Sequence, residues 1–403
     1  MHRLLIFVLL TLSVPVCAEN TEIGELKKQI ELLTQSVQQL NQRVETLEME
    51  KAILSEMAAM PATPPSPSVT KASPAQGVYQ NQNPDISVTG VFTVKGSGDQ
   101  RDPDRNSLKL DGTELNFSRS VSPYTRANAT IGFHDNEAHV EEAYADIAHT
   151  LPGELELRIG RFLAPMGYLN RIHPHDWPFV SKPLINSYFY GGEHGYSDDG
   201  LSLSKIIDLK SKTYVRLNVD ALNGNNSSLF NSGQTRVYGS RLSMHTPFND
   251  KQDMQLGVNY HDGAWNRAGD LGSKIYGADL MLRHRIDQFN RITLWGEWLW
   301  NEREQMVGKS IDSHGYYIST MYKFRKDHDW HVGLSYDCSE KPGDSRFNSI
   351  AQSAYVGYWL TENDRLQLQF RKLRDPFVGR DNNEIWLQFI WGMGPHKPHL
   401  ANF

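Results

Sequence analysis

The feature that most constrains the fold is an alternation of apolar and polar residues that recurs along residues 86–392. Residues 366–371, for example, place Leu366, Leu368 and Phe370 on one face of a strand and polar side chains on the other. About sixteen such segments follow one another, and a period of two is typical of β-strands with two unlike faces. Closed into a ring, such strands turn one face to lipid and the other to water. The pattern therefore predicts an all-β, antiparallel transmembrane barrel of about 16 strands.

The connections between the predicted strands alternate in length, and this distinguishes the two ends of the barrel. Long, mostly polar connections are expected at 96–107, 163–198, 223–235, 263–273 and 338–348. Short connections are expected at 151–154, 286–290 and 361–363. Outer-membrane barrels have short periplasmic turns and longer external loops, so the long connections are predicted to face outward. A soluble β-sandwich would not produce this alternation.

The first residues predict export from the cytoplasm. Residues 1–18 carry Arg3, an apolar stretch from Leu4 to Val16, and small residues that end at Ala18. A basic start, an apolar middle and a small-residue cleavage site define a secretory signal peptide. Cleavage would leave Cys338 alone in the mature chain, so no internal disulfide is expected. No other run approaches the roughly 18 apolar residues that a membrane-spanning helix needs.

Two segments precede the predicted barrel of residues 86–394, and a tail at 395–403 follows it. Residues 19–57 predict an N-terminal α-helical coiled coil in the periplasm, because apolar residues repeat at spacings of three and four. The seam consists of Ile23, Leu26, Ile30, Leu33, Val37, Leu40, Val44, Leu47 and Leu54. Residues 58–85 are rich in proline and predict an extended linker. β-branched residues alternating with leucine favour a parallel dimer, so we expect the chain to self-associate.

The polar faces of the predicted strands would line an aqueous channel, since a barrel of this size is wide enough for one. The candidate pore-lining residues are Arg126, Arg158, Arg216, Asp220, Arg241, Asp279, Arg283, Glu297, Arg365 and Arg371. Further carboxylates on the same faces are Glu142, Asp146, Glu156 and Asp337. The two signs are nearly balanced, whereas a ring of one sign would argue for ion selectivity. Charges of both signs would equally pair across the wall and stiffen it, and both interpretations stay open.

Residues 157–167, with the sequence LRIGRFLAPMG, resemble a strand and following turn of one porin superfamily. The chain is similar there to the phosphate-selective O/P porins and their siderophore-porin relatives, and residues 168–200 resemble a histidine-bearing, metal-linked subgroup. The resemblance implies a sixteen-stranded porin in the outer membrane. Phosphate-selective members cluster lysine and arginine in the pore, and this chain has no such lysine cluster. Porins of the general type are commonly trimers, so the number of associated chains stays open between two and three.

The connection 163–198 is the candidate constriction, because general porins fold their third external loop into the barrel. The residues singled out in this loop are His173, His175, Asp176, Trp177, Glu193 and His194. Of these, His173, His175 and His194 are the candidate metal ligands, because imidazole and carboxylate groups suit zinc. The alternative is that the histidines form hydrogen bonds within the loop. No other cofactor is expected.

These observations predict an outer-membrane channel through which small hydrophilic solutes or ions diffuse. The alternatives are an uptake channel for a divalent metal such as zinc or a metal chelate, and a structural protein that tethers the envelope through its coiled coil. No nucleophile motif suggests an enzyme. The net charge of −6 gives no reason to expect a nucleic-acid partner. The expected partners are outer-membrane lipid, further copies of the chain, a small solute and the barrel-assembly machinery, for which Phe403 resembles a terminal signal.

Overall fold

The computed structural model describes residues 83–134, 137–191, 195–209, 212–233, 235–325 and 329–395. The chain divides into two units, residues 1–80 and 81–403, and all the described residues belong to the second. The predicted signal peptide and coiled coil, nearly all of the linker and nearly all of the tail lie outside the described residues. No helix in the described part of the chain is long and apolar enough to cross a membrane.

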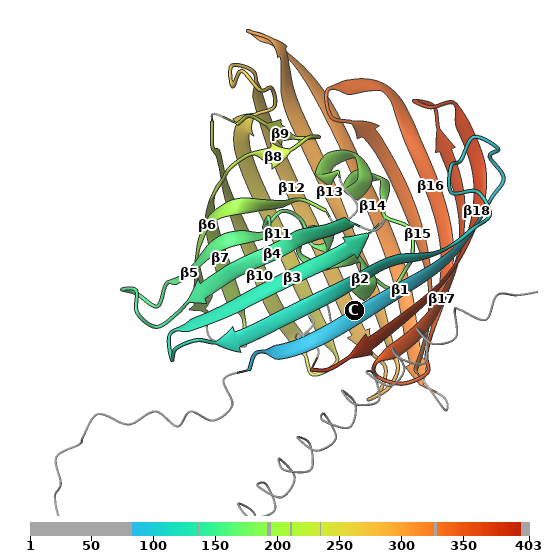
Figure 1. Ribbon diagram of the computed structural model, residues 1–403, viewed down its shortest axis with the longest axis horizontal. Helices are drawn as coiled ribbons and strands as arrows, with labels where there is room; N and C mark the ends of the chain where they lie inside the picture. The colour runs from blue at the N-terminus through green and yellow to red at the C-terminus, as the bar shows by residue number, and fades with distance from the viewer. Residues whose placement is uncertain are drawn as a thin grey trace, which may run out of the picture. The chain divides into compact units, whose positions relative to one another are not determined.

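Strands dominate the described residues, and Figure 1 shows them wrapped into a barrel. The first half comprises β1 (Asp85–Ser97), β2 (Ser107–Ser120), β3 (Thr125–His134), β4 (Glu137–Ile147), β5 (Glu156–Leu163), β6 (Ser197–Asp208), β7 (Tyr214–Leu222), β8 (Asn225–Asn226) and β9 (Phe230–Asn231). The second half comprises β10 (Val237–Asn249), β11 (Gln252–Ala264), β12 (Gly272–Arg285), β13 (Arg291–Met306), β14 (Lys309–Arg325), β15 (Asp329–Lys341), β16 (Asp344–Trp359), β17 (Asp364–Asp375) and β18 (Arg380–Met393). Three short helical segments lie between β5 and β6: η1 (Leu169–Arg171), η2 (Pro174–Asp176) and η3 (Asn186–Tyr190).

Sixteen of the described strands form one closed antiparallel sheet, which confirms the predicted all-β barrel of about 16 strands. Each strand pairs with its neighbour in sequence, apart from the small β8–β9 hairpin inserted between β7 and β10. The ring closes where β1 pairs with β18, from Val88 opposite Met393 to Ser97 opposite Glu384. Closure leaves no unpaired sheet edge, which a barrel in lipid requires.

The connections differ at the two ends, although less uniformly than the sequence suggested. At the end that holds the start of β1 and the end of β18, the turns are short, as at 250–251 and 286–290. The other end carries the 33-residue connection 164–196 and the β8–β9 excursion. The predicted loop 338–348 is wrong, because β15 and β16 continue pairing up to Lys341 opposite Asp344. These residues are polar on both faces, so the alternation ends before the strands do.

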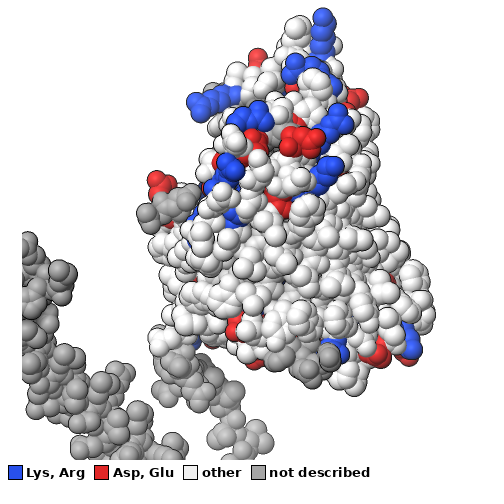
Figure 2. Space-filling view, turned by 90° about the vertical axis from the view of Figure 1, so that its right-hand side faces the viewer, with Lys and Arg blue, Asp and Glu red and all other residues white. Residues whose placement is uncertain are grey.

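The outer wall of the barrel is apolar around its middle. On β17, the outward side chains of Leu368 and Phe370 are 42% and 50% exposed, while the intervening Gln369 faces inward and is buried. On the face drawn in Figure 2, a broad band without charged residues lies below a charged upper part and above scattered charges at the lower edge. Aromatic side chains lie near both ends of the strands. Tyr276 packs against Trp300 toward one end (5.4 Å between ring centroids), and Trp330 packs against Tyr358 at the other (4.4 Å).

The interior of the barrel contains a hydrophobic core rather than a wholly open lumen. Residues of the 164–196 connection, among them Leu169, Phe179 and Phe189, pack against Trp295 and Tyr317 of the wall. All five are buried, at 3% exposure or less. In Figure 1 the green helical segments of this connection lie inside the ring of strands. One side of the lumen is therefore filled, and this determines where a candidate site can lie.

Candidate functional site

The connection 164–196, here called the inner loop, turns into the barrel directly after β5. Gly167 makes the turn with a positive φ of 61°, and a Cβ there would collide with the carboxylate of Glu297. Only glycine fits this position, because other residues avoid the left-handed region and the space is taken. The Gly167 N–H donates to Asn259 Oδ1 (3.1 Å), and the Leu169 N–H donates to Glu297 Oε1 (2.6 Å). Polar residues of β11 and β13 thus position the start of the loop.

The middle of the inner loop is bound to β17 through its backbone. Arg365 Nη2 donates to the carbonyl oxygens of His175 (2.6 Å) and Trp177 (3.0 Å). Gln369 Oε1 accepts hydrogen bonds from the N–H groups of Val180 (2.7 Å) and Ser181 (2.8 Å). These contacts satisfy loop backbone groups that are buried away from water, which would otherwise be costly. The inward polar face of β17 therefore binds the loop instead of facing an open channel.

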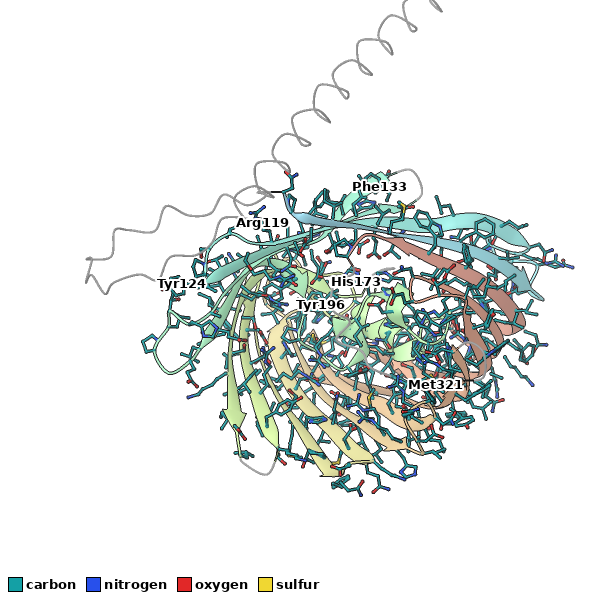
Figure 3. The ribbon with its side chains drawn as sticks, turned by 90° about the horizontal axis from the view of Figure 1, so that it is seen from below. Arg119, Tyr124, Phe133, His173, Tyr196 and Met321 are labelled. Carbon is teal, nitrogen blue, oxygen red and sulfur yellow. The ribbon has the colours of Figure 1, made fainter. Side chains whose placement is uncertain are left out.

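Asn170 joins the two ends of the inner loop. Its Nδ2 donates to the carbonyl oxygens of Ala164 (2.9 Å) and Tyr196 (3.1 Å), and its Oδ1 accepts from the Tyr196 N–H (2.7 Å). Asn170 is 2% exposed, so these hydrogen bonds form away from water, where each one is electrostatically stronger. Figure 3 shows Tyr196 and His173 within the ring of strands, while Tyr124 and Phe133 lie at its periphery.

A polar cavity of about 400 Å³ remains between the inner loop and strands β1–β7. Its wall includes Asp146, Glu156, Arg158 and Arg216, which lie at the strand ends next to the short turns. Arg158 forms a two-pronged ion pair with Asp146 (2.7 and 3.0 Å), and Arg216 pairs with Glu156 (2.6 Å). Opposite charges thus alternate along this wall. The cavity lies beside the part of the lumen that the inner loop fills.

The predicted pore-lining residues fall into two groups. Arg158 and Arg216 line the cavity, and Arg126 is exposed on the inner side of β3, where it donates to Ser118 Oγ (3.2 Å). The others lie in the wall away from the cavity lining, and most of them are buried. They are Asp220 beside His261, Arg241 paired with Asp279, Arg283 paired with Asp253, Glu297 bound to the inner loop, Arg365 bound to the inner loop, and Arg371 near Glu384. The sequence could not reveal that the loop would cover one side of the wall.

The residues predicted for the constriction also separate. His173, His175 and Asp176 line the cavity, whereas Trp177 is 3% exposed and belongs to the packed core. The Trp177 indole donates to the carbonyl oxygen of Ile172 (3.2 Å), so it stabilises the loop itself. Glu193 and His194 lie outside the described residues, and the metal-ligand prediction for His194 stays a prediction.

His173 and His175 lie side by side with three buried glutamates of the wall. Their rings are stacked, with centroids 5.6 Å apart. His173 contacts Glu142 through Nε2 (3.0 Å), and its Nδ1 faces Glu114 (3.4 Å) and Glu141 (3.3 Å). His175 Nδ1 is 3.2 Å from Glu114 Oε1. Loop histidines and wall carboxylates therefore form one cluster at the edge of the cavity.

A β-bulge explains how two consecutive glutamates reach this cluster. Thr130 pairs with Glu142 but Ile131 pairs with Val140, which leaves Glu141 as an extra residue on β4. The bulge interrupts the alternation, so Glu141 and Glu142 are both buried inside the barrel. Glu114 occupies an ordinary inward position of β2. The apolar–polar alternation of β2 was the one sequence signal that would have identified Glu114 as inward-facing. Sequence reasoning missed Glu114 and Glu141 as neighbours of the histidines.

The electrostatics of the cluster favour a cation. Burial opposes protonation of His173, but the carboxylates of Glu114, Glu141 and Glu142 outweigh burial and raise the pKa of His173 well above its ordinary value. Burial also opposes protonation of His175. Glu114 and Asp176 outweigh burial there and raise the pKa of His175 above its ordinary value. Glu141 is also paired with His134 (3.1 Å), and either protons on the loop histidines or a metal ion would neutralise the remaining negative charge.

Comparisons with known proteins place this geometry among outer-membrane barrels. No family model matches the chain. A protein of Aquifex aeolicus (strain VF5), described only as uncharacterized, is 26% identical over 344 residues, which is 73% of this chain and 70% of that protein.

Several solved structures share the fold. OmpT of Vibrio cholerae, an outer membrane protein folded in vitro, aligns with a TM-score of 0.53 at 9% identity, covering 79% of this chain and all of that one. OprB of Pseudomonas putida gives 0.53 at 11% identity, covering 77% and 94%. The anion-selective porin of Comamonas acidovorans gives 0.51 at 12% identity, covering 76% and 99%. At these identities the likeness is one of fold, and the chain has the barrel fold of outer-membrane porins.

Proposed function

We propose that this protein is an outer-membrane channel through which small hydrophilic solutes or ions diffuse, with the inner loop as its constriction. The observation that carries the proposal is a closed barrel with an apolar outer belt and a polar cavity inside. A charge-free belt suits contact with lipid, and closed strands leave no backbone group unpaired there. A polar cavity beside the loop offers a hydrated route on the inside.

The proposed route is narrow and mixed in charge. The inner loop is bound to the wall at both β13 and β17 and fills one side of the lumen. Carboxylates and guanidinium groups alternate along the cavity, which suits small polar or zwitterionic solutes better than ions of one sign. We therefore infer a narrow, solute-restricted channel instead of the wide pore that an unobstructed barrel of this size would form.

The same proposal includes the finer features expected from the sequence. The resemblance of residues 157–167 supports a relationship to the phosphate-selective O/P porins, without their lysine cluster. A periplasmic coiled coil, self-association as dimers or trimers, and assembly by the barrel-assembly machinery complete the proposed arrangement. One solved structure with this fold is described as a trimer form, OmpT of Vibrio cholerae, and it makes three chains a reasonable first hypothesis.

Swelling of proteoliposomes tests the route. Vesicles that contain the folded barrel are diluted into isosmotic solutions of a monosaccharide, a neutral amino acid and a trisaccharide. We expect swelling with the monosaccharide and the amino acid, and little with the trisaccharide, because the cavity is small. Equal rates for all three solutes would contradict the constriction. Rates no higher than those of protein-free vesicles would contradict the channel.

A second candidate function is uptake of a divalent metal ion. The observation that favours it is the grouping of Glu114, His173 and His175 on the wall of the cavity. A metal that travels through the cavity would meet these side chains on its way.

A further inference from the structure

Three side chains converge at the edge of the cavity with the spacing of metal ligands. Glu114 of β2 and the loop residues His173 and His175 each offer a ligand atom, and these atoms all lie within 4.8 Å of one another. Glu114 Oε2 is 3.4 Å from His173 Nδ1, and Glu114 Oε1 is 3.2 Å from His175 Nδ1. Ligand atoms on a tetrahedral zinc ion with bonds of about 2.0–2.1 Å are about 3.3 Å apart. Only small movements would bring the three groups onto one ion.

The other nitrogen of each ring already has a carboxylate partner. His173 Nε2 lies 3.0 Å from Glu142 Oε2, and His175 Nε2 lies 3.4 Å from Asp176 Oδ1. Histidines that bind metals usually donate their second N–H to a carboxylate, which orients the ring and makes the free nitrogen more basic. The same arrangement would leave both Nδ1 atoms as ligands facing Glu114.

His173 Nδ1 supplies a second observation, a buried ring nitrogen that lacks a hydrogen bond. This atom is buried and makes no hydrogen bond to any of the described residues. Its residue is 8% exposed, and carboxylate oxygens of Glu114 and Glu141 lie 3.4 and 3.3 Å from it without forming a hydrogen bond. A buried ring nitrogen that has only ion-pair contacts and no hydrogen bond is less well satisfied than one that forms a hydrogen bond. A cation between the His173 ring and the Glu114 carboxylate would contact both groups.

We propose that Glu114, His173 and His175 bind a divalent transition-metal ion of the zinc type from the cavity. Two imidazoles and one carboxylate suit zinc, whereas magnesium and calcium prefer sites made of oxygen alone. All three residues line the cavity, so three protein ligands leave a coordination position open toward solvent. An ion there exchanges with the cavity, unlike the ion of a closed structural site. A role of this site in transport rests on the proposed channel function, whereas metal binding by the three residues does not.

Calorimetric titration of the folded, chelator-treated full chain with zinc chloride tests the proposal. We expect one saturable site per chain in the wild type. Glu114→Gln and His175→Gln each remove a ligand and should weaken zinc binding more than tenfold, and Glu142→Gln should weaken it by about 10–100-fold through the orientation of His173. The matched control is His139→Gln, because His139 forms an exposed pair with Glu137 (3.5 Å) away from the cluster. That variant should bind zinc like the wild type.

X-ray absorption at the zinc edge provides a test on the wild type alone, in case a variant fails to fold. We expect a first shell of nitrogen and oxygen atoms with the multiple scattering of two imidazole rings. No saturable binding, a first shell without imidazole, or equal affinity in the ligand variants would overturn the proposal. If the protein binds zinc but lets no solute pass, the metal site is supported and the channel proposal is contradicted. If solutes pass but zinc does not bind, the channel is supported and the metal site is contradicted.

Discussion

Arg241 and Asp279 form an ion pair inside the barrel, with only 2% and 5% of their side chains exposed. The two nitrogens of the guanidinium fork meet both carboxylate oxygens, at 2.6 and 2.8 Å. Two charges without water are stable only when each satisfies the other. The sequence identified both residues as inward-facing, because alternation gives the face of a strand. It could not reveal their burial, which depends on where the inner loop packs.

Asp279→Asn is expected to destabilise the folded barrel by about 3–5 kcal/mol, because it leaves the guanidinium of Arg241 buried without its counter-charge. Equilibrium unfolding in guanidinium chloride, followed by tryptophan fluorescence in lipid vesicles, measures the loss. The double variant Arg241→Met with Asp279→Asn should recover most of it, since a neutral pair needs no counter-charge.

The control for this prediction is Asp146→Asn, which breaks the Arg158 pair on the cavity wall. Those side chains are 35% and 36% exposed, so water replaces the lost partner and the expected cost is below about 1 kcal/mol. Equal losses for Asp279→Asn and Asp146→Asn would show that the Arg241 pair is hydrated and would contradict its burial.

At the scale of elements, the inner loop decides what the lumen can do. Its position was expected from the porin resemblance. Its anchoring was not predictable, because the partners of its backbone are Glu297, Arg365 and Gln369 on distant strands. The bulge at Glu141 was equally hidden, since two adjacent polar residues do not by themselves show that the strand pairing skips one of them.

Phe179→Ala is expected to loosen the inner loop. Phe179 stacks on Trp295 (6.4 Å between ring centroids) and meets the edge of Tyr355 (5.6 Å), so the loop is held by packing as well as by hydrogen bonds. Removing a buried phenylalanine costs about 3–5 kcal/mol. We predict larger and noisier single-channel currents than in the wild type.

Phe248→Ala is the matched control, because Phe248 is 61% exposed near the end of β10 and does not belong to the hydrophobic core that holds the inner loop. Its currents should equal those of the wild type. Unchanged currents in Phe179→Ala, with the loss of stability confirmed, would mean that the loop does not restrict the channel.

At the scale of the whole molecule, the barrel itself was the most predictable feature. Alternation in sequence corresponds directly to inward and outward faces, as β17 shows with Gln367 and Gln369 inside and Leu368 and Phe370 outside. Strand ends were less predictable, because above the apolar belt both faces are polar while pairing continues, as in β15 and β16. The filled side of the lumen was not predicted, since apolar residues in a loop give no indication of the wall they meet.

The apolar belt should tolerate a charge at its rim and not at its centre. Leu280 lies on the outer face of β12, between Tyr276 and the turn at 286–290. The substitution Leu280→Arg should lower the free energy of unfolding by about 2–4 kcal/mol. Leu108→Arg, at the outer end of β2, should cost about 0–1 kcal/mol. Refolding equilibria in phospholipid vesicles measure both values. A belt in contact with water would give similar, small costs at the two positions.

Removal of residues 20–80 should leave the currents unchanged. The closed barrel lies wholly within the second unit of the chain, and β1 begins at Asp85. The variant is compared with the full mature chain in planar bilayers, and its envelope phenotype is scored separately. If the protein is chiefly a tether, this deletion should abolish its envelope phenotype. If it is a channel, the deletion should leave its conductance unchanged. Loss of conductance in a correctly folded variant would contradict the independence of the barrel.

The central claim is that this chain forms a channel narrowed by the inner loop, and single-channel recording in planar lipid bilayers tests it most directly. The purified, folded wild-type protein should insert and produce discrete, ohmic current steps. These steps should be smaller than those of a barrel of the same size with an unobstructed lumen, because one side is filled by the loop and its hydrophobic core. Folded protein that inserts into the bilayer and gives no steps at either polarity would contradict the claim.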